Sequence, residues 1–91
     1  MEKNKKEEAL VNFKKARSHI EKIIRMIEAR EYCINIMQQN LAVIGLLRSA
    51  HQTLMERHLN SCFRSALDSK NEKKKKMMVE EILRVTKLLG K

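Results

Sequence analysis

Apolar side chains recur at intervals of three and four residues over three stretches of this chain, a spacing typical of helices with an apolar face. The stretches cover residues 9–29, 32–67 and 74–89. The segment Arg30-Glu31-Tyr32 interrupts the pattern, and Asp68-Ser69-Lys70-Asn71 supplies a turn signal before the last stretch. We therefore predict an all-α chain of three helices, preceded by a charged and flexible segment over residues 1–8.

The predicted second helix is apolar on two sides. One stripe consists of Ile34, Met37, Leu41 and Ile44 and ends at Arg48, and the other consists of Ile36, Val43, Leu47, Ala50 and Leu54. The first helix can cover one of these sides, so the other is predicted to face another subunit in a helical oligomer.

The composition agrees with few, long helices. The chain of 91 residues has no proline, and only 3% of its residues are aromatic, so its core must be built from aliphatic side chains. We predict a single domain over residues 1–91. A helical monomer of this size buries only a modest core, which again favours oligomerisation.

The formal net charge of +9 makes nucleic acid the leading candidate partner, with an anionic membrane surface second. No apolar run approaches the roughly 20 residues needed to span a bilayer, and the charged N-terminus lacks the apolar core of a signal peptide. A cytosolic location is the simplest expectation. There, two cysteines are expected to bind metal or sense redox state rather than to form a structural disulfide.

Cys33, His58 and Cys62 are the candidate metal ligands. Two thiolates and one imidazole form a donor set that soft Cu(I) prefers. His58 and Cys62 stand four residues apart, so one helix face presents both. Cys33 precedes His58 by 25 residues, about 37 Å along a straight helix. Either the chain folds back or a second copy supplies that thiolate, and antiparallel pairing of two such helices points to a metal site bridging two protomers.

The residues alone also allow plainer interpretations. A cysteine in an apolar helix is commonly a small buried side chain, and a His-x-x-x-Cys spacing arises by chance. The run Lys73 to Lys76 is by default a solvated face. No acid/base constellation or phosphate-binding loop is present, so an enzyme is not expected.

The order of residues over most of the chain closely resembles the copper-sensitive operon repressor (CsoR) family of bacterial metal-sensing regulators. The resemblance rests on residues 19–28 (HIEKIIRMIE), Tyr32-Cys33, residues 36–39 (IMQQ), 41–43 (LAV) and 58–63 (HLNSCF), and extends to residues 79–83 (VEEIL). Relatives that sense other metals, formaldehyde or persulfide differ at one or more ligand positions, so the ligand set resembles the copper branch.

The resemblance implies antiparallel protomers forming a dimer with a four-helix bundle, and two dimers forming a flat homotetramer. Cys33 of one protomer would join His58 and Cys62 of its neighbour in a trigonal Cu(I) site. Tyr32 and Glu81 match positions that hydrogen-bond around the ligating histidine and fix its tautomer.

The implied function is a copper-responsive repressor whose metal-free form binds operator DNA and whose Cu(I) form releases it, derepressing copper-resistance genes. Lys14, Lys15, Arg17 and Arg48 keep the implied DNA-binding surface positive. The chain departs from the family at Asn12, where many relatives carry an arginine that contacts DNA, and at Ser49, near a position that is basic in some members.

Two rival functions remain open. In the first, a thiol-based sensor, Cys33 and Cys62 of neighbouring chains form a disulfide or polysulfide bridge and His58 only tunes thiolate character. In the second, a basic helical adaptor coats nucleic acid and its cysteines are structural.

Overall fold

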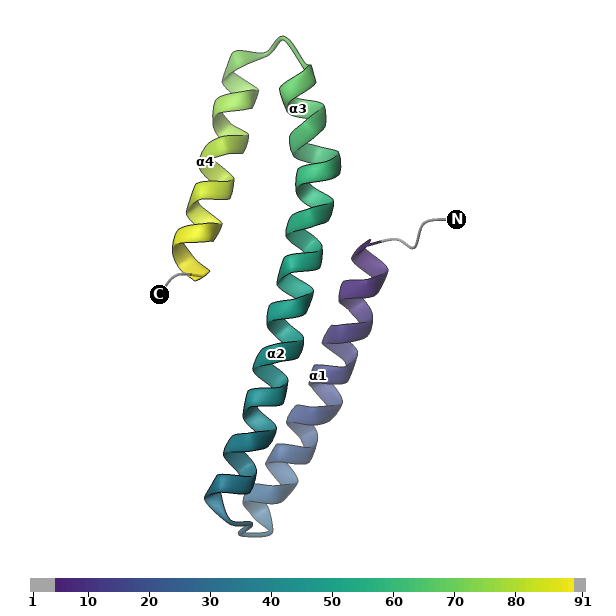
Figure 1. Cartoon of the computed structure of the whole chain (residues 1–91), viewed down its shortest axis with the longest axis vertical. Coiled ribbons are helices and arrows are strands. Elements are labelled where there is room, and N and C mark those ends of the chain that lie inside the picture. The colour runs from purple at the N-terminus through teal and green to yellow at the C-terminus, as the bar shows by residue number, and fades with distance from the viewer. Residues whose placement is uncertain (1–4, 90–91) are drawn as a thin grey trace. The chain divides into compact units, whose positions relative to one another are not determined.

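The computed structural model describes residues 5–89, and it is all-helical with no strand in that range (Figure 1). The elements are α1 (Lys5–Glu28), α2 (Cys33–His58), a π-helix η1 (Leu59–Phe63), α3 (Arg64–Asp68) and α4 (Glu72–Leu89). The chain divides into two compact units, Met1–Glu56 and Arg57–Lys91. Across the described residues, no helix combines the length and the apolar character that crossing a membrane requires.

The three predicted helical stretches are confirmed, but their ends differ. The first helix begins at Lys5, so residues 5–8, which lie before the predicted start of the helix, are helical, while residues 1–4 lie outside the described part. Lys5 Nζ lies 3.6 Å from Glu8 Oε2 and 3.5 Å from Glu56 Oε2, so these ion pairs link this end of α1 to its own first turn and to α2. The nearby Glu8 carboxylate, followed by Glu56, raises the pKa of Lys5. The last helix begins at Glu72, two residues before the predicted start.

In the first unit, α1 and α2 form an antiparallel hairpin (Figure 1). Polar contacts mark its register, since Asn12 Nδ2 donates to Ser49 Oγ at 3.1 Å and His19 Nε2 lies 2.6 Å from Gln39 Oε1. The buried side chains of this unit are small and stand seven residues apart on each helix: Ala9 and Ala16 on α1, and Val43 and Ala50 on α2. Small side chains at a heptad spacing allow the two helices to pack closely.

Many larger apolar side chains of the hairpin stay exposed. The exposed fractions are 58% for Ile27, 59% for Met37 and 66% for Leu41, and among the described residues no large side chain is fully buried. Burial of apolar area provides most of the favourable free energy of folding, so a single copy of this hairpin leaves much of that contribution unused.

The connection between α1 and α2 contains the one non-glycine residue with a positive φ among the described residues, Arg30 at 57°. The Glu31 N–H donates to Met26 O at 2.9 Å, and the Arg30 N–H donates to Ile27 O at 3.0 Å. These two bonds form a Schellman motif that satisfies the last carbonyls of α1, in a conformation that glycine adopts most readily.

Arg30→Gly is expected to stabilise the protein. A left-handed backbone costs a residue with a Cβ roughly 1–2 kcal/mol, and the extra freedom of glycine in the unfolded chain cancels part of the gain. We expect the free energy of unfolding, measured by urea denaturation, to rise by about 0.5–1 kcal/mol. Arg30→Ala is the control, since it removes the same charge but keeps the Cβ, and an equal gain in both variants would contradict this explanation.

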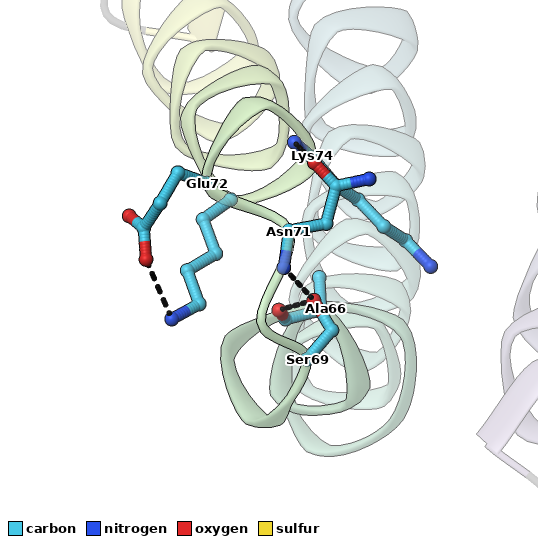
Figure 2. A network of polar contacts seen from close by, with 6 residues as sticks. Ala66, Ser69, Asn71, Glu72 and Lys74 are labelled. Atoms are coloured by element: carbon cyan, nitrogen blue, oxygen red, sulfur yellow. Dashed lines mark hydrogen bonds and ion pairs between the residues drawn. The ribbon is translucent and has the colours of Figure 1, made fainter.

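In the second unit, a hydrogen-bonded turn joins α3 to α4 where the turn was predicted (Figure 2). Ser69 Oγ donates to Ala66 O at 2.6 Å and accepts the Asn71 N–H at 3.4 Å. Asn71 Oδ1 in turn accepts the Lys74 N–H at 3.1 Å, which makes Asn71 the N-cap of α4. The side chains of Ser69 and Asn71 thus satisfy backbone groups at the end of one helix and the start of the next.

Candidate metal centre and nucleic-acid interface

Cys33 is the first residue of α2, with an exposed and free thiol. Tyr32 positions it, because Tyr32 O accepts the N–H groups of Asn35 at 3.0 Å and Ile36 at 3.3 Å and so starts the helix. The Tyr32 side chain is 71% exposed. The thiol of Cys33 is therefore presented on the surface of the first unit, where a metal ion or another chain can reach it.

His58 and Cys62 flank a change in helix type. His58 is the half-buried last residue of α2, and Cys62 lies within the π-helix η1 with an exposed and free thiol. Ser61 Oγ lies 4.0 Å from Cys62 Sγ. The prediction of one regular helix through Leu67 is wrong over Leu59–Phe63, where hydrogen bonds run from i to i+5. Single π-turns within α-helices are rare and occur frequently at functional sites.

The three predicted ligands are divided between the two compact units. Among the described residues no three His, Cys, Asp or Glu side chains gather into a group that could hold a metal ion. Cys33 belongs to the first compact unit, whereas His58 and Cys62 belong to the second. Glu81 is exposed on α4, and within residues 57–89 no hydrogen bond joins its side chain to His58.

The predicted DNA-contacting side chains of Lys14, Lys15, Arg17 and Arg48 are all exposed on the α1–α2 hairpin. The Asn12–Ser49 hydrogen bond joins α1 and α2 close to these basic residues. Arg48 directly precedes Ser49, and the three basic residues of α1 follow Asn12 within five positions. Asn12 and Ser49 are two of the positions at which the resemblance led us to expect basic residues, and their bond places a neutral polar pair in this part of the hairpin.

The donor set fits a soft monovalent cation. Cys33 and Cys62 are both free rather than joined in a disulfide, and both are exposed. Thiolate ligands select Cu(I) and zinc over hard cations, and imidazole suits both copper and zinc. Three donors leave a zinc ion short of the four ligands of its usual structural site. The available residues are thus better matched to Cu(I).

An all-helical chain with two exposed free thiols, a half-buried imidazole and a basic hairpin has the features of a metal-responsive DNA-binding regulator. The model of the metal-sensitive transcriptional repressor family matches residues 5–89. The chain belongs to this family, whose members are repressors and not enzymes, and the resemblance predicted from the sequence is confirmed.

Named relatives are copper sensors. The copper-sensing transcriptional repressor CsoR of Mycobacterium ulcerans (strain Agy99) is 41% identical over 64 residues, which is 70% of this chain and 55% of that protein. CsoR of Mycobacterium tuberculosis (strain ATCC 25618 / H37Rv) is 38% identical over 63 residues, covering 69% and 53%. The copper-sensing repressor RicR of the same strain is 42% identical over 45 residues, covering 50% and 47%. The chain thus spans about half the length of these relatives.

Proposed function

We propose that this protein is a copper(I)-responsive transcriptional repressor that binds operator DNA in its metal-free form and releases it when Cu(I) is bound. The observation that carries the proposal is the set of Cys33, His58 and Cys62, free to bind metal, in a chain about 40% identical to copper-sensing repressors. Family membership supplies the role of repressor, and the donor set supplies the choice of metal.

The proposed site is shared between two copies of the chain. Cys33 begins α2 and His58 ends it, so two α2 helices in antiparallel pairing would bring Cys33 of one copy toward His58 and Cys62 of the other. The three donors would bind one Cu(I) ion, which would link the two chains. Tyr32, beside Cys33, and Glu81, on α4, are proposed to hydrogen-bond around the ligating imidazole and hold it in one tautomer.

The exposed apolar side chains of the hairpin support this pairing. Side chains such as Met37 and Leu41 would be buried if a second hairpin packed antiparallel against the first, giving a four-helix bundle. We propose a homodimer of this kind that pairs again into a homotetramer, in the cytoplasm. The basic hairpin residues Lys14, Lys15, Arg17 and Arg48 would then contact DNA phosphates from several copies.

Repression requires that the metal site and the DNA surface influence one another. If Cu(I) lowers DNA affinity, DNA must lower Cu(I) affinity by the same factor, and a coupling free energy of roughly 1–3 kcal/mol is typical. The π-turn offers a place for such coupling, because it lies in the same continuous helical segment as His58 and contains Cys62.

An anaerobic Cu(I) titration tests the proposal when it is combined with fluorescence anisotropy on DNA from upstream of the gene. A copper repressor should bind one Cu(I) per chain against a competing chelator and release DNA as the site fills. Equal DNA affinity of the metal-free and Cu(I)-loaded protein would refute the regulatory role even if copper is bound. Release by polysulfide but not by Cu(I) would assign the two free thiols to a persulfide sensor.

His58→Ala separates these two functions. Loss of the imidazole removes one of three copper donors. We therefore expect half-maximal DNA release to require a Cu(I) concentration at least about tenfold higher than in the wild type. A sensor that bridges Cys33 and Cys62 through sulfur would keep most of its response. His51→Ala is the matched control, because His51 is also half-buried on α2 but is not a proposed ligand. Anisotropy titrations of both variants with Cu(I) and with polysulfide decide between the functions.

A further inference from the structure

The first turn and a half of α4 carries an unusual concentration of positive charge. Lys73, Lys74, Lys75 and Lys76 are consecutive, and Lys70 lies in the preceding turn. All except the half-buried Lys75 are exposed. Lys75 is also the member with an acidic partner, since its Nζ lies 3.3 Å from Glu72 Oε1. Within the described residues no ion pair joins the other lysines of this group to an acid, and in Figure 2 no dashed line reaches the side chain of Lys74.

The position of these lysines is unfavourable for the helix itself. The N-terminus of a helix carries a partial positive charge, so acidic side chains are stabilising there and cations are stabilising at the opposite end. Glu72 follows this rule in the first turn and Lys87 follows it in the last. Lys73, Lys74 and Lys76 instead place positive charge at the N-terminal end of α4, where it is unfavourable. A solvated helix gains nothing from three cations at this end, whereas a bound polyanion would make them favourable.

The helix also directs two of these lysines away from its packed side. Met78 and Ile82 are half-buried, and the spacing of four residues places them on one face of α4. Lys73 and Lys76 fall on the opposite face, at the 3.6-residue period of the helix. Their side chains are therefore accessible to a large partner without any change in how α4 packs on its own unit.

We propose that Lys73 and Lys76, flanked by Lys70 and Lys74, form a second DNA-binding surface that contacts the phosphate backbone. This inference rests on the proposed function, because the phosphates are those of the operator. A transcriptional repressor meets DNA as its polyanionic partner. Lysines without interleaved aromatic side chains suit phosphate contacts rather than reading of bases, so this surface adds affinity without adding sequence specificity.

The test compares two double variants of the full chain. Lys73→Gln/Lys76→Gln removes two charges from the proposed surface. Arg84→Gln/Lys87→Gln removes two charges with the same spacing of three residues from the same face of α4, at its C-terminal end. DNA binding is measured by anisotropy over a range of salt concentrations, on upstream DNA and on an unrelated duplex, together with thermal unfolding and Cu(I)-induced release.

The first variant should bind both DNAs about tenfold more weakly at 0.1 M salt, and the slope of log K against log salt should fall by about 2 for each contacting chain. It should unfold at the same or a higher temperature, because unfavourable cations have left the helix N-terminus. The control should keep wild-type affinity and slope. Cu(I)-induced release should persist in both.

Wild-type affinity and salt slope in the Lys73→Gln/Lys76→Gln variant, with Cu(I)-induced release intact, would overturn this inference and leave the proposed function standing. An equal loss in the control variant would also overturn it, because the effect would then follow net charge alone. Cosedimentation with vesicles of mixed phosphatidylserine and phosphatidylcholine is measured in parallel, and binding that is lost in Lys73→Gln/Lys76→Gln while DNA binding is unchanged would assign the surface to membranes and overturn the inference. Absence of Cu(I)-induced release in the wild type would refute the proposed function, and a loss of DNA affinity and salt slope confined to Lys73→Gln/Lys76→Gln would still support this surface as a DNA contact.

Discussion

Cys62→Ala is expected to abolish the copper response while leaving DNA binding intact. Cys62 is one of two thiols in the proposed site, and soft thiolate donors supply most of the preference for Cu(I). We expect Cu(I) affinity to fall by at least about 100-fold, since loss of an outer hydrogen-bonding partner alone costs metal sites 10–100-fold. Competition with a chelator measures the affinity, and anisotropy on upstream DNA measures the release.

Ser61→Ala is the matched control for this variant. Ser61 is exposed, precedes Cys62 within the same π-turn and places its hydroxyl oxygen 4.0 Å from the Cys62 sulfur. Its removal perturbs the same backbone without removing a donor, so the copper response should survive. A Cys62→Ala protein that still released DNA at wild-type Cu(I) concentrations would exclude Cys62 as a ligand.

Mixed oligomers should recover copper sites that neither parent variant forms. In a dimer that pairs one Cys33→Ala chain with one Cys62→Ala chain, one shared site lacks both thiols and the other keeps both. Random mixing of equal amounts should therefore restore about a quarter of the wild-type copper capacity, because half of the dimers are mixed and each has one intact site. Denaturing and refolding the two variants together, followed by Cu(I) titration, measures this capacity.

The control for this experiment mixes each variant with itself, which should restore nothing. A site formed within one chain would give no recovery in the mixed sample either, because every chain would lack one of its thiols. That result would remove the second copy from the proposed site. Recovery above one half, the maximum that mixed dimers allow, would indicate that a copper site does not need both Cys33 and Cys62.

Most of the fold could be predicted because each helix has a clear chemical boundary. The Ser69–Asn71 turn was identified from residues that cap helices, and Asn71 does cap α4. The helical conformation of residues 5–8 was not predicted, because these residues are all charged and have no apolar face, and the contact of Lys5 with Glu56 joins residues distant in sequence. Neither hydrophobic periodicity nor charge composition contains information on such a contact.

The candidate site was less accessible to sequence reasoning. Spacing identified Cys33, His58 and Cys62 as a set, and their roles remain proposals. The π-turn that contains Cys62 had no sequence signal, because residues 59–63 include neither proline nor glycine and retain helical character. A change from i+4 to i+5 hydrogen bonding alters the backbone without altering the pattern of apolar residues that the prediction used.

The buried residues of the hairpin have a consequence for the amount of protein in a cell. Its buried side chains are alanines and one valine, and none of the larger side chains among the described residues is fully buried. If association buries the remaining apolar surface, the free energy of assembly becomes part of the free energy of folding, and stability depends on protomer concentration by mass action. Dilution would then unfold the protein as well as dissociate it. The copy number would set both the occupancy of DNA and the lifetime of each chain against proteolysis.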